Sequence, residues 1–246
     1  MKVKNRLLNF GDKIIYQDDD YFAFSLDSVL LANFVTLKLS DKKIVDFCSG
    51  NGPIPMLMSF RTKARIFGVE LQKEIFDMGY DSIKENGMDE QLEFINDDVN
   101  DISKIMDAES VDVVTCNPPY FKYKEDSLIN DNIVLTIARH EVKLKLEDVI
   151  KKARYVLKNG GTFAMVHRPD RMIEIINLMQ KYGIEPKRLR LVYPKVGKDA
   201  NILLIEGIKN GKTGLKVLSP LYTHNSDGSY VDEIREMFGG NADVAE

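Results

Sequence analysis

The stretch that decides the fold is Val111-Asp112-Val113-Val114-Thr115-Cys116-Asn117-Pro118-Pro119-Tyr120. Its first six residues form a largely apolar run that predicts a buried strand. Two successive prolines cannot continue a hydrogen-bonded ladder or a helix, so the strand must end at a rigid, extended corner. An amide precedes this corner and an aromatic ring follows it. We therefore expect a site held on a stiff element, with Asn117, Pro118 and Tyr120 at its centre.

Apolar strand patterns alternate with helical patterns on both sides of this stretch, which predicts a doubly wound, mostly parallel α/β sheet. The last two strands form an antiparallel pair at one edge and bring the expected number of strands to seven. Gly160 and Gly161 indicate where the predicted helix 146–157 stops. The expected strands are 43–48, 65–70, 92–95, 111–116, 162–166, 188–193 and 201–208, and the expected helices are 53–60, 72–86, 146–157 and 169–182.

The segments outside this pattern predict three regions: an extension at 1–40, the sheet domain at 41–222 and a tail at 223–246. The extension has strand-like runs at 12–16 and 21–24 around a polar turn, which predict a β-hairpin, followed by a helix at 26–38. Further predicted elements are a mobile polar loop at 121–132, an edge strand at 215–218 and a short helix at 230–238.

Composition narrows the class of protein. The chain has 246 residues, of which 44% are hydrophobic, and no apolar run long enough to span a membrane. Its two cysteines, Cys48 and Cys116, predict neither a disulfide framework nor a metal site. We expect a cytoplasmic protein without a metal. The sequence does not decide the oligomeric state, although a monomer is favoured.

Charge is spread unevenly along the chain. The net charge of −4 argues against a protein that coats nucleic acid with a wholly basic surface. Residues 70–112 carry fourteen acids and three bases, whereas residues 184–198 carry five bases and one acid. Such asymmetry can present one positive face to an anionic partner, although single charges more often cover solvated surfaces.

Polar residues follow each of the first three predicted strands. Asp46 precedes a loop with Gly50 and Gly52, which let the backbone approach a ligand closely. The third glycine of a dinucleotide fingerprint is missing, and the acid suits a ligand with an ammonium or sulfonium group. Glu70 is placed to accept both hydroxyl protons of a ribose. Asp97 or Asp98 is placed to accept from an adenine amine, and a loop or helix-capping role is the alternative.

This ordered set resembles the Rossmann-like S-adenosylmethionine-dependent methyltransferases, and the Asn-Pro-Pro-Tyr form resembles those that methylate an exocyclic or amide nitrogen. More narrowly, the chain resembles the tRNA1(Val) adenine-37 N6-methyltransferase family over roughly residues 5–222. The segments 24–32, 117–121 and 138–141 carry this narrower resemblance. It implies S-adenosylmethionine as cofactor, tRNA as partner and the seven-stranded methyltransferase sheet, with an N-terminal hairpin and an antiparallel edge strand.

The resemblance also assigns residues to the cofactor. Phe24 and Asp27 would close over its methionine part, with packing and helix capping as alternatives, and Asn117 would lie beside it. One departure is that Cys48 stands where the family's loop has its first glycine. Because cysteine is small, we expect cofactor binding to survive, with a first turn that is less extreme than one built on glycine.

The corner suits transfer to a planar amine, whose lone pair is delocalised into its ring. The Asn117 side-chain oxygen and the Pro118 carbonyl would accept its two N–H bonds and turn the lone pair toward the methyl donor. Catalysis would come mainly from positioning and oriented dipoles. Tyr120 would stack on the base, and Phe121 would form a second apolar wall. Such stacking contributes about 1–3 kcal/mol per base.

Basic side chains are candidates for contact with RNA. Arg139 and His140 are placed to meet phosphate, with an ion pair or a helix surface equally compatible. His167 and Arg168 follow the fifth strand at the ligand end of the sheet, where they are candidates to face RNA. Lys187 and Arg188 belong to the basic stretch, and contacts of this kind to a tRNA backbone are sensitive to salt.

We therefore predict an enzyme that methylates the N6 amine of an adenine in tRNA, with adenine 37 of valine tRNA as the expected target. Alternatives that use the same corner are methylation of a release-factor glutamine at N5 and of an amine in ribosomal RNA or DNA. A non-catalytic RNA-binding module is a further alternative, which the cofactor constellation disfavours.

Overall fold

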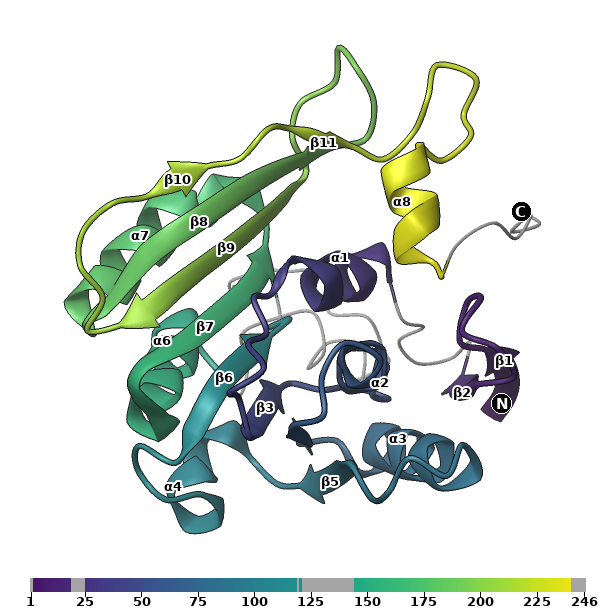
Figure 1. Cartoon of the computed structure of the whole chain (residues 1–246), viewed down its shortest axis with the longest axis horizontal. Coiled ribbons are helices and arrows are strands. Elements are labelled where there is room, and N and C mark those ends of the chain that lie inside the picture. The colour runs from purple at the N-terminus through teal and green to yellow at the C-terminus, as the bar shows by residue number, and fades with distance from the viewer. Residues whose placement is uncertain (1, 19–24, 119, 121–143, 240–246) are drawn as a thin grey trace, which may run out of the picture.

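A nine-stranded sheet forms the centre of the protein in a computed structural model, which describes residues 2–18, 25–118, 120 and 144–239 (Figure 1). The strand order is β10-β8-β9-β7-β6-β3-β4-β5, and β11 also pairs with β8. The first five strands of the sheet, β3 to β7, run parallel to one another, as predicted. The strands of this sheet are β3 (Lys43–Phe47), β4 (Arg65–Glu70), β5 (Leu92–Asn96), β6 (Val111–Cys116), β7 (Leu157–His167), β8 (Ile184–Tyr193), β9 (Ile202–Lys209), β10 (Lys216–Val217) and β11 (Leu221–Tyr222).

The antiparallel strand is β9, which lies between β7 and β8 and pairs antiparallel with both. β9 is therefore an inner strand of the sheet and not an edge strand. Two short strands, β10 and β11, extend the sheet beyond β8 and pair with it in parallel. Because β8 and β7 both oppose β9, they run in the same direction, and their carboxyl ends lie at the same edge.

Helices cover both faces of the sheet, and side chains alternate between the two resulting cores. In β3, Ile44 belongs to the core under α1 and α2, whereas Val45 and Phe47 belong to the core under α6 and α7. This double burial explains why the strands read as apolar runs. The helices are α1 (Leu26–Phe34), α2 (Pro53–Ser59), α3 (Lys73–Glu85), η1 (Val99–Asp101), α4 (Ile102–Ile105), α6 (Leu146–Val156), η2 (Pro169–Arg171), α7 (Met172–Lys181) and α8 (Asp232–Met237).

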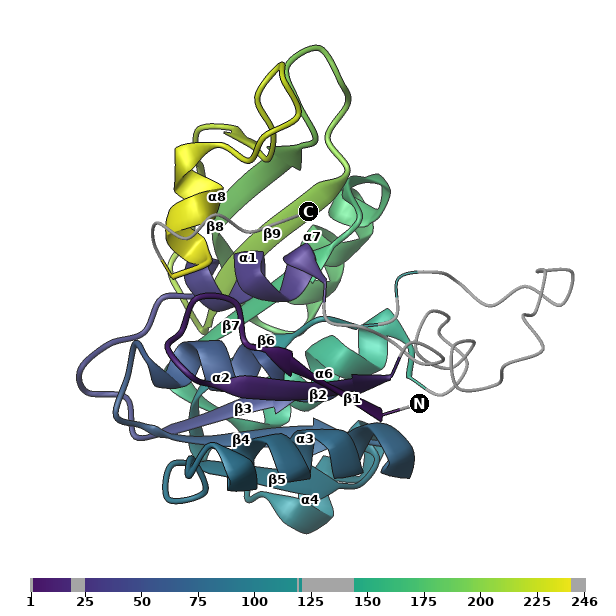
Figure 2. The same ribbon diagram turned by 90° about the vertical axis from the view of Figure 1, so that its right-hand side faces the viewer.

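The N-terminal hairpin forms, but from other residues than predicted. Its strands are β1 (Lys2–Arg6) and β2 (Ile14–Asp18), paired antiparallel from Lys2 and Asp18 to Arg6 and Ile14. Gln17 and Asp18, which we expected in the turn, belong to β2, and the predicted strand 21–24 lies outside the described residues. Figures 1 and 2 show the hairpin beside α3.

The expected glycine stop after α6 is also wrong. Helix α6 passes directly into β7 at Leu157, which is buried and pairs with Val111. Gly160 and Gly161 lie within the strand, where the pairing register with β6 shifts. Gly160 has a φ of 77°, so glycine permits the irregular backbone here and does not end a helix.

Candidate active site

The candidate site lies where the carboxyl ends of β3, β4, β5 and β6 meet at one edge of the sheet. In the parallel register, Phe47 lies beside Val69 and also beside Cys116. Glu70 lies beside Asn96. The loops that follow these strands therefore begin next to one another, as the sequence predicted for the polar residues that follow them.

The loop after β3 is held by backbone bonds and by close packing. Ser49 N donates to the Val69 carbonyl at 3.0 Å, and Gly52 N donates to the Ser49 carbonyl at 3.0 Å. Gly52 has a φ of 92°, and a Cβ on it would lie 2.4 Å from Cζ of the Phe94 ring. No larger residue fits at this point, so the glycine lets the loop approach β5 before α2 begins.

Cys48 adopts a left-handed backbone with a φ of 56°, so the prediction of a less extreme first turn is wrong. The neighbouring bonds explain this conformation. The loop must turn at Cys48 for Ser49 N to reach Val69 and for Gly50 N to reach the Glu70 carboxylate. The cysteine therefore adopts a left-handed backbone that glycine reaches more readily.

Glu70 is buried at the end of β4, and its carboxylate braces two loops. Oε2 accepts from Gly50 N at 2.9 Å and Oε1 accepts from Gln72 N at 2.9 Å. Burial raises the pKa of the Glu70 carboxyl, and these backbone bonds oppose the shift. Each oxygen keeps acceptor capacity that a pair of ribose hydroxyls can use. The sequence predicted the position of this carboxylate but not its bracing of the loops.

Asp46 is fully buried at the penultimate position of β3. Its Oδ1 accepts from the Thr115 hydroxyl at 2.6 Å, and burial raises the pKa of its carboxyl to about 7. Neither Asp46 Oδ2 nor the Ser49 hydroxyl forms a hydrogen bond of good geometry with a described residue, although the Ser49 hydroxyl lies close enough to the Asp46 carboxyl to oppose the rise in its pKa. Buried polar atoms are rarely left unpaired, so these two fit a ligand that brings its own donor to the loop.

Asp97 and Asp98 follow β5, and both use one carboxylate oxygen locally. Asp97 Oδ1 accepts from Asp98 N at 2.7 Å. Asp98 Oδ1 accepts from Asn100 N at 2.8 Å and caps η1. Both residues are half-buried. Each carboxylate therefore has a capping or turn role and keeps a second oxygen for a ligand. These contacts favour neither aspartate over the other as the partner of a ligand amine.

The corner after β6 is tied to α1 by a short hydrogen-bonded chain. The Tyr120 hydroxyl lies 2.5 Å from Asp27 Oδ2 and 2.6 Å from Asn117 Oδ1. Burial raises the pKa of both the Asp27 carboxyl and the Tyr120 hydroxyl. The sequence assigned Asp27 to the cofactor and Tyr120 to the base. It gave no sign that the two side chains meet and fix the orientation of the Asn117 amide.

His167, which the sequence placed with Arg168 as a candidate to face RNA, is a further residue at this corner. It is buried at the end of β7, and its ring centroid lies 5.2 Å from that of Tyr120. Nδ1 accepts from Arg168 N at 2.7 Å, while Nε2 has no partner among the described residues. Burial, and next the charge of Arg171, lower the pKa of His167 to about 4. The ring is therefore neutral at pH 7 and carries its hydrogen on Nε2.

The predicted RNA contacts divide into two groups. Arg168 follows His167, and its charge opposes the rise in the pKa of Asp27, so it acts on the corner. Lys187 and Arg188 lie in β8 and make internal contacts: Lys187 Nζ donates to the Lys212 carbonyl at 2.9 Å. The remaining predicted site residues lie outside the described part of the chain: Phe24, Phe121, Arg139 and His140.

Within the residues that the structure describes, no group of three or more histidine, cysteine or carboxylate side chains is placed to bind a metal ion. Within them, too, no helix combines the length and the apolar character that a membrane span requires.

Comparisons with known proteins place this site in a family. Residues 25–183 match the model of the methyltransferase small domain. The tRNA1(Val) (adenine(37)-N6)-methyltransferase of Bacteroides fragilis strain YCH46 is 24% identical over 93% of this chain and 96% of its own length. The protein of that name from Photobacterium profundum is 25% identical over 75% and 76%.

Solved structures share the fold. The structure of a predicted O-methyltransferase from Agrobacterium tumefaciens covers 89% of this chain and 99% of its own, with a TM-score of 0.70 and 23% identity. A geranyl diphosphate C-methyltransferase from Streptomyces coelicolor, solved with S-adenosyl-L-homocysteine, covers 74% and 76%, with a TM-score of 0.56 and 14% identity. The family match spans more than half of the sequence and includes the loop after β3 and the corner after β6. The chain therefore belongs to the methyltransferase small domain family.

Proposed function

We propose that this methyltransferase transfers a methyl group from S-adenosylmethionine to the N6 amine of an adenine in cytoplasmic tRNA, with adenine 37 of valine tRNA as the target. The observation that carries the proposal is the chain of hydrogen bonds from Asp27 through Tyr120 to Asn117, next to the loop after β3. The names of the relatives support the choice of tRNA and of adenine 37.

Residues of this chain fit the cofactor along the edge of the sheet. Asp46 and Ser49 offer unpaired buried oxygens to its ammonium end. Glu70 offers acceptor capacity to its ribose, and Asp97 or Asp98 offers an oxygen to its adenine amine. The cofactor supplies an activated methyl group on sulfur, so the chain itself has to provide position and dipoles.

The corner presents the acceptor amine. Asn117 Oδ1 accepts from Tyr120 and keeps a second lone pair for one amine N–H, while the Pro118 carbonyl takes the other. Tyr120 has one hydroxyl hydrogen, which it donates to Asn117 and which thereby holds the amide in one orientation. Asp27 holds Tyr120 in turn as the neutral acid, whose proton is donated to the Tyr120 oxygen, and burial favours this form because it raises the pKa of the Asp27 carboxyl. Two acceptors on one nitrogen favour a pyramidal geometry, which frees the lone pair for attack on the methyl group.

Asn117→Ala tests this assignment. The variant loses one of the two acceptors, and we expect methyl transfer to total tRNA to fall about 100-fold or more, the loss typical of a preorganised hydrogen-bonding group. Cofactor affinity, measured by calorimetry, should change less than about twofold. Asn159→Ala is the matched control, since Asn159 is an exposed asparagine near the amino end of β7, whereas Asn117 lies at the carboxyl ends of the strands.

Two outcomes would contradict the proposal. Equal losses of cofactor affinity and transfer in Asn117→Ala would make the corner a structural element only. Mass spectrometry of the labelled products identifies the acceptor, and label on a release-factor glutamine in place of tRNA adenine would assign the same corner to protein substrates.

A further inference from the structure

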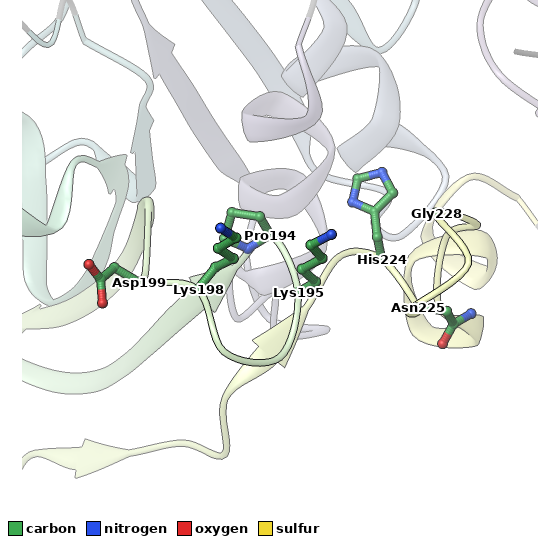
Figure 3. A pocket seen from close by; sticks show the side chains of 7 residues that line it. All are labelled: Pro194, Lys195, Lys198, Asp199, His224, Asn225 and Gly228. Carbon is green, nitrogen blue, oxygen red and sulfur yellow. The ribbon is translucent and has the colours of Figure 1, made fainter.

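A pocket of about 550 Å³ lies between the turn that joins β8 to β9 and the segment 223–230. Most of its lining surface is carbon, and its polar atoms come from basic, amide and carboxylate side chains; Figure 3 shows Lys195, Lys198 and His224 along it. Figures 1 and 2 show both segments beyond the carboxyl end of β8. This is the edge of the sheet at which β7 ends, so the pocket shares an edge with the candidate active site.

The walls of the pocket are fixed to each other by hydrogen bonds. Thr223 N donates to the Tyr193 carbonyl at 2.9 Å. His224 N and the Thr223 hydroxyl both donate to the Pro194 carbonyl, at 3.0 and 2.9 Å. The His224 ring stacks on Tyr230 with centroids 4.5 Å apart. The pocket is therefore preorganised, and a ligand would pay little to order it.

Of the five basic residues of the stretch 184–198, Lys195 and Lys198 line this pocket, while Lys187 donates to the backbone carbonyls of Lys212 and Thr213. Arg188 is paired with Glu206, and Arg190 forms a two-pronged pair with Glu233. Lys195 and Lys198 are exposed, and neither forms an ion pair with any residue that the structure describes.

One carboxylate, that of Asp199, also belongs to the lining. In Figure 3 it points away from the other labelled side chains. The two ammonium groups therefore outnumber the acid, and the pocket suits an anion.

We propose that this pocket binds the phosphodiester backbone of the RNA substrate, with Lys195 and Lys198 neutralising phosphates while the target base enters the corner at Asn117. The inference rests on the proposed function, because it extends the binding of the same substrate along the same edge. His224 and Asn225 add polar contacts to the sugar or the phosphate, as side chains of these types do in nucleic-acid complexes.

The test compares two double variants of equal charge change. Lys195→Ala/Lys198→Ala removes the pocket ammonium groups, and Lys212→Ala/Lys216→Ala removes two exposed lysines that follow β9, the second of them in β10. Binding of unmodified tRNA transcript is followed by fluorescence anisotropy from about 50 to 200 mM salt. The pocket variant should bind on the order of tenfold or more weakly, and its slope of log Kd against log salt should be shallower by about two. The control should keep both values.

The outcomes separate this inference from the proposed function. If both variants bind tRNA like the unaltered protein, while tRNA is methylated normally, the pocket does not bind RNA and the inference is overturned alone. If tRNA is not methylated but the pocket variant still loses affinity and slope, the RNA site stands and the proposed reaction is wrong. Lys195→Glu/Lys198→Glu, with its fold checked by circular dichroism, should deepen the loss.

Discussion

At the scale of single residues, Cys48 is under backbone strain because of the loop that it belongs to. Its φ of 56° places a Cβ in the left-handed region, which costs about 1–2 kcal/mol for a residue other than glycine. The bonds of the next two residues, Ser49 N to Val69 and Gly50 N to Glu70, select this conformation. The site therefore stores strain directly beside the residues assigned to the cofactor.

This strain predicts an inverted order of stability for two variants. Cys48→Gly and Cys48→Ala both lose the thiol, but only alanine keeps the strained Cβ. We expect the glycine variant to be more stable by about 1 kcal/mol, because relief of strain exceeds the added entropy of the unfolded chain. Urea unfolding measures the difference. At Cys116, which lies in β6, alanine should be the more stable of the same pair. An alanine advantage at both positions would show that Cys48 is unstrained.

The residues of the site could be predicted where they lie at the carboxyl end of a strand or directly after it. Asp46, Glu70 and Asn117 are in this class, because an apolar run that ends in a polar residue marks the ligand edge of the sheet. The contact of Asp27 with Tyr120 joins positions 93 residues apart. No local pattern encodes such a contact, since it depends on how α1 lies over the finished sheet.

At the scale of elements, prediction succeeded where an element carries its own signal. The bounds of β4 and β6 match because their apolar runs are buried by helices on both faces of the sheet. β1 was missed because all five of its residues are exposed, so no hydrophobic period marks it. The hairpin is held instead by α3: Tyr16 N donates to Ser82 Oγ at 2.9 Å.

Asn86 makes the most direct link between the hairpin and α3. Its Oδ1 accepts from Ile14 N at 2.9 Å, and its Nδ2 donates to the Ile14 carbonyl at 2.7 Å. Asn86→Ala leaves both backbone groups unpaired, and we expect a loss of about 1–3 kcal/mol of stability. Hydrogen exchange should speed up at the amides of Ile14 and Tyr16 and stay unchanged in β5. Equal acceleration in both places would mean that the hairpin is no separate docking unit.

At the scale of the whole molecule, Arg188 connects the far strands of the sheet to the segment after α1. Its guanidinium donates to Thr36 Oγ1 at 2.6 Å and pairs with the buried Glu206 carboxylate at 3.2 Å. Thr36 N also donates to Glu206, at 2.7 Å. A basic stretch in a sequence thus includes charges with internal partners, which the sequence cannot distinguish from charges that face a ligand.

Because Arg188 has internal partners, we expect its replacement to lower the stability of the protein without changing RNA binding. Arg188→Met removes the charge but keeps an apolar stem near the Phe34 ring, which the guanidinium covers at 4.7 Å. Because Glu206 is left buried with its Thr36 donors but without its partner charge, we expect a loss of about 1–3 kcal/mol in urea unfolding. This is below the cost of breaking a fully buried pair, since Arg188 is partly exposed. The salt dependence of tRNA binding should not change, in contrast to Lys195→Ala/Lys198→Ala. A shallower salt slope with unchanged stability would instead place Arg188 on the RNA.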